Sequence, residues 1–61
     1  MSPRQEFIDA VRARNAVAIG EQVDYYRLHG CTYSVIFDMA RSVDPELDQA
    51  TWDALLAESE E

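Results

Sequence analysis

The chain has 61 residues and a formal net charge of −7 at pH 7, with 12 acidic and 5 basic side chains. So short a chain forms one domain, and its acidity disfavours direct binding to nucleic acid, because that affinity comes mainly from neutralising phosphates. The single cysteine, Cys31, excludes an intramolecular disulfide, and no Cys/His set is present to hold a structural metal. With neither kind of cross-link, we expect helix packing, self-association or a partner to stabilise the domain.

The N-terminal residues contain no apolar signal-peptide core. No stretch approaches the roughly 20 apolar residues that a membrane span needs. A free thiol without an export signal is typical of a cytoplasmic protein, so we expect that location and no contact with membranes.

A short pattern recurs four times, at residues 8–12, 23–27, 37–41 and 52–56. Each copy contains a large apolar residue, an aspartate and two apolar residues, and the first three copies end in arginine. An acid three positions before an arginine shares a helix surface with it, where the two attract, and the apolar residues form a stripe at helical spacing. The period is shorter than that of known solenoid repeats, which favours separate helices built to similar local rules. We therefore predict an all-α fold: one domain over residues 1–61, a small bundle of three to four short amphipathic helices.

The first predicted helix covers residues 3–14. Ser2 is a suitable N-cap, Pro3 suits the first helical position, and Gln5 can complete a capping box. Asn15 can end this helix, or the helix can continue through it. The side chains expected to face inward are Phe7, Ile8 and Val11.

The second predicted helix covers residues 16–29. Gly20 inside it costs about 1 kcal/mol relative to alanine. Gly30 suits the position just past a helix, and His29 lies favourably near the negative helix end. The side chains expected to face inward are Ala16, Ile19, Val23 and Tyr26.

The third predicted helix begins after a cap at Thr32 or Ser34 and ends near residue 42. Residues 33–37 are also rich in strand formers, but a lone strand would have no pairing partner in this chain. The side chains expected to be buried are Ile36, Met39 or Ala40, and Val43.

Asp44 and Pro45 predict the start of the last helix, as an N-cap followed by proline. That helix either runs unbroken from residue 45 to about 58 or begins at 51 after a single turn. Residues 58–61 are expected to form a frayed acidic tail.

Charge and apolar character combine in the last third of the chain. Residues 42–61 carry seven acids and no base, whereas residues 1–41 carry five of each. In the fourth copy of the pattern, Leu56 replaces arginine, so we expect a partner to bind this helix. Trp52 is either a core residue, which we favour, or an interface residue. The candidate partner-binding residues are Tyr25, Asp44, Glu46, Asp48, Trp52, Asp53 and Leu56.

Residues capable of catalysis or metal binding are few. His29 and Cys31 are two positions apart at a helix end, which favours a C-cap histidine and a small buried cysteine. The alternating acids after residue 43 resemble the start of a calcium loop, but Gln49 stands where glycine is needed and Leu55 where glutamate is needed. We predict no catalytic residue, no metal site and no cofactor.

The sequence therefore favours a non-enzymatic interaction module, an inhibitor or adaptor that binds a protein partner with a basic surface. Small acidic helical proteins of phage or mobile elements provide an analogy of size and charge. Self-association into a homo-oligomer is a further expectation. Two alternatives stay open: an acidic nucleic-acid mimic that blocks a DNA- or RNA-binding protein, and a helix-turn-helix regulator. The second alternative rests on a similarity to DNA-reading helix pairs, with Gly30 near the turn.

Overall fold

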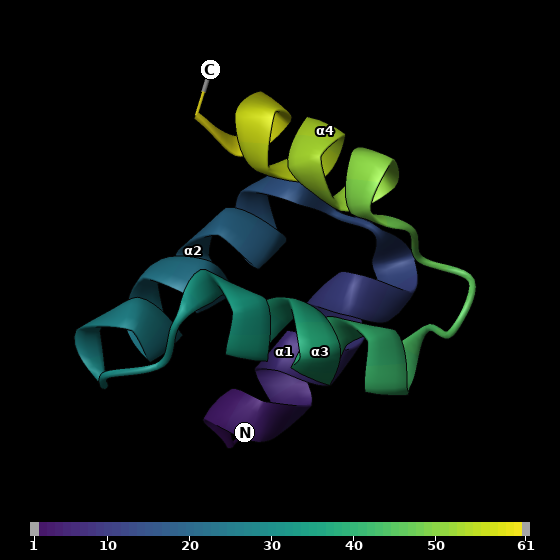
Figure 1. Ribbon diagram of the computed structural model, residues 1–61. Coiled ribbons are helices and arrows are strands. Elements are labelled where there is room, and N and C mark those ends of the chain that lie inside the picture. The colour runs from purple at the N-terminus through teal and green to yellow at the C-terminus, as the bar shows by residue number, and fades with distance from the viewer. Residues whose placement is uncertain (1, 61) are drawn as a thin grey trace.

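The computed structural model describes residues 2–60, which form four helices and no strand. These are α1 (Pro3–Ala13), α2 (Ala16–Leu28), α3 (Tyr33–Val43) and α4 (Gln49–Ser59). Helix α2 is central, because it packs against each of the other three, and α1 also packs against α3. Figure 1 shows α4 at the top, over the first half of α2, with α1 and α3 below. The prediction of a small all-α bundle is confirmed.

Each helix begins with a polar side chain that accepts a hydrogen bond from the backbone N–H three residues later. The acceptor–donor pairs are Ser2–Gln5, Asn15–Ala18 and Thr32–Val35, each at 3.2 Å, and Asp48–Thr51 at 2.7 Å. Such caps satisfy donors that have no partner inside the first turn. Ser2 and Thr32 are therefore confirmed as caps. Asn15 starts α2, so the first two helices are separate.

Two predictions about helix starts are wrong. The side-chain amide of Gln5 donates to Asp9, at 2.9 Å, so it does not complete a capping box with Ser2. Asp44 terminates α3, and Asp48 caps the last helix in its place. The helix thus begins between the two predicted positions.

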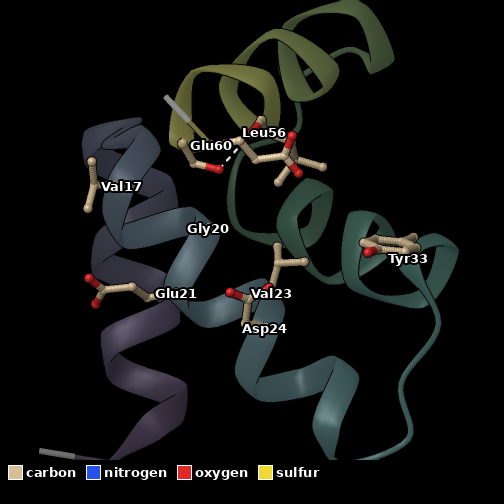
Figure 2. A pocket seen from close by; sticks show the side chains of 9 residues that line it. Val17, Gly20, Glu21, Val23, Asp24, Tyr33, Leu56 and Glu60 are labelled. Atoms are coloured by element: carbon tan, nitrogen blue, oxygen red, sulfur yellow. Dashed lines mark hydrogen bonds between the residues drawn. The ribbon is translucent and has the colours of Figure 1, made fainter.

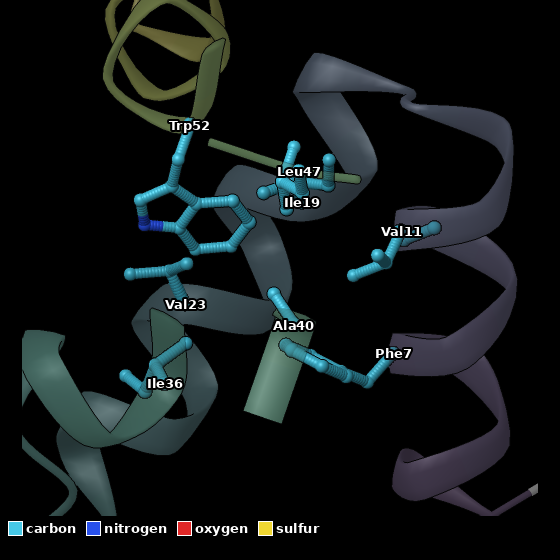
Figure 3. Packing of buried hydrophobic residues seen from close by; sticks show 9 residues of the cluster. Phe7, Val11, Ile19, Val23, Ile36, Ala40, Leu47 and Trp52 are labelled. Atoms are coloured by element: carbon cyan, nitrogen blue, oxygen red, sulfur yellow. The ribbon is translucent and has the colours of Figure 1, made fainter. Parts of the chain in front are cut away.

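The burial of Leu47 explains this later start. Its backbone N–H closes a turn onto the Asp44 carbonyl at 3.1 Å, and its side chain is buried in the core. The turn at residues 44–47 brings this leucine into the core cluster that also contains Ile19 (Figure 3). Burying an apolar side chain of this size contributes about 2 kcal/mol, which offsets the loss of one helical turn.

The first two helices end in the same hydrogen-bond pattern. After α1, Arg14 adopts a left-handed conformation with φ 49°, and the next residue, Asn15, donates its N–H to the Ala10 carbonyl at 3.1 Å. After α2, Gly30 has φ 91°, and Cys31 donates to the Tyr26 carbonyl at 3.0 Å. Both are Schellman motifs, which favour glycine because it has no Cβ to clash. The prediction for Gly30 is confirmed.

One core joins all four helices. Its large members include Phe7, Ile36 and Trp52, and Figure 3 shows Trp52 between α4 and the side chains of Val23 and Ile36. Trp52 is only 2% exposed, and its ring lies 5.8 Å from that of Phe37, centroid to centroid. The predicted inward residues that are buried are Phe7, Val11, Ala16, Ile19, Val23, Ile36 and Ala40. Ile8, Tyr26, Met39 and Val43 are half-buried. The prediction missed Ala10 and Leu47.

The recurring pattern marks the inner and outer faces of the helices correctly. Its four aspartates are exposed, and the apolar residue before each aspartate is buried or half-buried. The expected aspartate–arginine pairs do not form. Within residues 2–60 the only ion pair joins Arg14 to Asp44, at 3.0 Å, from different parts of the chain.

The predicted frayed tail is shorter than expected. Helix α4 continues through Ser59, which is half-buried, and Glu60 is its C-cap. Glu61 lies outside the described residues. None of the helices in residues 2–60 combines the length and apolar character needed to cross a bilayer.

Candidate protein interaction site

A hollow of about 450 Å³ lies between α2 and the end of α4, with the start of α3 at its side. We call it the α2–α4 groove. Figure 2 shows Leu56 of α4 and Glu60, which follows it, on one side of the groove and α2 side chains on the other. The residues that line it are Val17, Gly20, Glu21, Val23, Asp24, Tyr33, Leu56, Ser59 and Glu60.

Gly20 sets how closely the two helices cross. A Cβ atom at this position would lie 2.6 Å from Ser59 Oγ and 2.7 Å from Ser59 Cβ, closer than non-bonded atoms approach. A side chain on residue 20 would therefore push the end of α4 outward. The close crossing explains why α2 carries a glycine in its interior despite the lower helix propensity.

The groove exposes large apolar side chains. Val17 is 62% exposed and Tyr33 is 57% exposed, while Leu56 is half-buried. Tyr33 also borders a neighbouring hollow that contains Leu28, the most exposed large apolar side chain at 86%. An exposed apolar side chain is ordinary when it stands alone, but a contiguous set around a hollow marks an interaction site.

Three carboxylates surround these apolar side chains. Glu21 and Asp24 belong to α2, and Glu60 follows α4. Within residues 2–60 none of the three accepts a side-chain hydrogen bond or forms an ion pair, and all three are exposed. The groove therefore combines apolar side chains with uncompensated negative charge.

Arg27, a base in the neighbouring hollow, is held by two other contacts. Its guanidinium carbon lies 4.4 Å from the centroid of the Tyr33 ring, a cation–π arrangement. The same side chain donates to the backbone carbonyl of Cys31 at 3.4 Å. Arg27 thus fixes Tyr33 at the side of the groove and does not neutralise the carboxylates of Glu21 and Glu60.

The three apolar and aromatic residues predicted to bind a partner lie in different places in the structure. Leu56 lines the groove. Trp52 fills the core, which is the alternative favoured from the sequence, so its side chain is not exposed to a partner. Tyr25 does not line the groove; its ring contacts those of Tyr26, at 5.2 Å, and His29, at 4.3 Å.

The four predicted carboxylates do not form one patch. Asp44 is paired with Arg14, and Asp53 accepts a hydrogen bond from the Gln49 side chain at 2.8 Å. Glu46 is exposed in the turn before α4. Asp53 borders a second hollow, which shares Tyr33 and Leu56 with the groove. These acids mostly serve local structure.

Asp48 illustrates that structural role. The pKa of its carboxyl lies below the ordinary value, first because the Thr51 side chain hydrogen-bonds to it and then because the Thr51 backbone N–H donates to it. Both bonds favour the ionised form. The carboxylate of Asp48 is thus a helix cap.

Four residues of the groove were not predicted as site residues: Val17, Glu21, Asp24 and Tyr33. The sequence does indicate the first three, because α2 carries apolar residues outside the face formed by its buried residues Ala16, Ile19 and Val23. Val17 and Leu28 lie opposite Ile19 on a helical projection, with Asp24 next to Val17. Apolar residues on the solvent side of a helix, beside acids, indicate a contact surface.

His29 and Cys31 each have a local structural place. His29 Nδ1 lies 2.8 Å from the Tyr25 carbonyl oxygen, as expected of a histidine at a C-cap, and Cys31 is half-buried against the core. In the range 2–60, no group of three or more His, Cys, Asp and Glu side chains is placed to hold a metal ion. Residues 29–32 join α2 to α3, but Arg41 is the only base on α3, so this helix has little to offer a phosphate backbone.

Comparison with models of known protein families, with curated proteins and with solved structures gives no match to this chain. The candidate site is therefore defined by the geometry of this chain alone.

Proposed function

We propose that the protein is a non-catalytic interaction module, an inhibitor or adaptor, that binds a partner protein through the α2–α4 groove. The observation that carries this proposal is the placement of exposed Val17 and Tyr33 beside three carboxylates that form no ion pair within residues 2–60. Apolar side chains in a hollow gain free energy when a partner covers them, while a charged rim selects the partner.

The chemistry of the lining favours binding over catalysis. The groove contains one serine, Ser59. Its hydroxyl donates a hydrogen bond to the Leu56 carbonyl at 2.7 Å, so it is not hydrogen-bonded to a base that could activate it as a nucleophile. The carboxylates of the groove are exposed to water, whereas catalytic groups usually lie in enclosed clefts.

The charge of the groove favours a partner with a basic surface. The net charge of the whole chain is −7, and three of its acids, Glu21, Asp24 and Glu60, lie in the groove beside the apolar residues. Complementary charge accelerates association and disfavours acidic competitors. The protein partner is therefore expected to present lysine or arginine around an apolar anchor.

Two matched variants test the proposal. Val17 lines the groove, while Val35 is a 46% exposed helical valine on α3 that does not. Val17→Arg and Val35→Arg make the same change in an exposed helical valine. The new arginine lies four residues before Glu21 in the first variant and three residues before Asp38 in the second, so each has an acid nearby. Tagged wild type and both variants are used to purify partners from the source cells, with quantification by mass spectrometry.

We expect a partner that is recovered with wild type and Val35→Arg and reduced about tenfold with Val17→Arg, because the substitution adds a cation and removes an apolar contact. Unchanged far-UV circular dichroism of both variants shows that the fold is intact. Equal recovery with all three proteins would contradict binding through the groove.

A further inference from the structure

We infer that the α2–α4 groove accepts a basic amphipathic helix of the partner. In this arrangement an apolar side chain enters beside Val17 and Leu56, and flanking lysine or arginine side chains pair with Glu21, Asp24 and Glu60. The inference rests on the proposed function and adds the secondary structure and charge of the segment that is bound.

The walls of the groove favour a helical segment. They are made of α2, the end of α4 and the first residue of α3, and residues 2–60 contain no strand. The groove therefore has no sheet edge whose backbone could pair with an extended peptide. A helix satisfies its own backbone hydrogen bonds, so it can cover an apolar surface without leaving polar groups unpaired.

The length of the groove fits about two helical turns. Its α2 wall runs from Val17 to Asp24, which at about 1.5 Å per residue corresponds to roughly 10 Å. Side chains at positions i, i+3 and i+4 of a bound helix repeat on this scale. One or two apolar anchors, with basic residues on either side, match the apolar centre and acidic rim.

Charge argues against a second copy of this chain as the occupant. A symmetric dimer places the same patch on both sides of the contact. That contact would bring Glu21, Asp24 and Glu60 against the same acids of the other copy. The nearby Arg27 is held by Tyr33 and the Cys31 carbonyl, so it is not positioned to relieve this repulsion.

Synthetic peptides test the inference directly. The probe is a peptide of ~14 residues with leucine at helical spacing and lysine elsewhere, long enough to form a helix when bound. One control peptide carries glutamate in place of lysine, and the other carries the probe residues in an order without helical periodicity. Amide chemical shifts of ¹⁵N-labelled protein report both the affinity and the place of binding.

We expect the probe alone to shift the amides around Val17, Glu21 and Tyr33, with little change at Arg4 and Ser42, which line a different hollow. The dissociation constant should increase as salt is raised, because exposed charges are screened beyond about 8 Å at physiological ionic strength. Equal affinity of the glutamate peptide would overturn the requirement for a basic partner. Equal affinity of the peptide without periodicity would overturn the requirement for a helix.

Two triple variants locate the carboxylates that matter. The first, Glu21→Gln, Asp24→Asn and Glu60→Gln, neutralises the rim of the groove. The second, Glu6→Gln, Asp38→Asn and Glu46→Gln, removes the same three charges from exposed positions outside the groove. The first should weaken probe binding about tenfold, since each exposed pair contributes a factor of about 1.4 to 5, and the second should have little effect. Equal weakening would show attraction to net charge alone and overturn the inference.

The remaining outcomes separate this inference from the proposed function. If the probe causes no shifts while partner recovery still depends on Val17, the bound segment is not a basic helix and the proposed function stands. If partner recovery does not depend on Val17, the proposed function fails. A dimer in sedimentation experiments that is lost in Val17→Arg would identify a second copy as the occupant and overturn the inference.

Discussion

Substitution of Gly20 by alanine tests the close crossing of α2 and α4. In an unhindered helix interior this change stabilises a protein by about 1 kcal/mol, because alanine has the higher helix propensity. Here the new methyl group would lie 2.6 Å from Ser59 Oγ and 2.7 Å from Ser59 Cβ. Rotation of the serine side chain can move Oγ but not Cβ, so the end of α4 must shift. Overpacking typically costs about 1–3 kcal/mol, and the expected net change is therefore between no effect and a loss of about 2 kcal/mol.

A double-mutant cycle with Ser59→Gly isolates the steric contribution. This second substitution removes both clashing atoms and leaves Ser59 Cα, at 4.0 Å, as the nearest atom. In that background Gly20→Ala should stabilise the protein by about 1 kcal/mol. Urea unfolding monitored by far-UV circular dichroism and Trp52 fluorescence gives the four free energies. A coupling energy of about 1–3 kcal/mol is expected, and additivity within about 0.5 kcal/mol would refute the close contact.

Three further substitutions test the core, a helix end and a cap. Trp52→Ala should cost about 3–5 kcal/mol and unfold most of so small a domain; a cooperative native-like melt by circular dichroism would contradict the central place of this side chain. Arg14→Gly should be about 1 kcal/mol more stable than Arg14→Ala, because both lose the Asp44 ion pair but only glycine adopts φ 49° without strain; equal melting temperatures would argue against that backbone conformation. Asp48 has a lowered pKa in the folded protein, so its stabilisation is present above the ordinary pKa of 3.8 and is lost as the pH falls through the folded-state value. In Asp48→Asn the side chain keeps an oxygen that can cap the helix but has no carboxyl group to titrate. The free energy of unfolding of this variant should therefore fall less steeply with pH below 3.8 than that of the wild type. An unchanged acid transition would exclude the carboxylate of Asp48 as a contributor to acid unfolding.

Local hydrogen bonds explain which parts of the fold could be predicted. The caps at Ser2 and Thr32 and the turn at Gly30 involve partners three to five residues away, so the sequence around each position contains both groups. The same holds for the outward aspartates, whose apolar neighbours must face the core. The start of α4 could not be read in this way. Asp44 and Asp48 are both good caps, and the choice between them depended on burying Leu47 in the core that the other helices form.

The candidate site was the least predictable part of the molecule. The concentration of acids in residues 42–61 drew attention to Asp44, Asp48 and Asp53, but the structure uses these carboxylates in an ion pair, a cap and a local side-chain bond. Charge counted along the chain does not show which carboxylates already have partners. That information depends on side chains brought together by folding, such as Arg14 and Asp44, which are 30 residues apart.

The sequence by itself determined the helices, most of their ends and most of their buried faces, because these depend on contacts within a few residues and on helical periodicity. Only the tertiary structure decided that Trp52 belongs to the core and that the end of α4 crosses α2 at Gly20. It also placed Tyr33 and Leu56 beside the carboxylates of α2 to form a groove. The physical reason is that helix crossings are fixed by the packing of the whole core, to which every helix contributes and which no local pattern specifies.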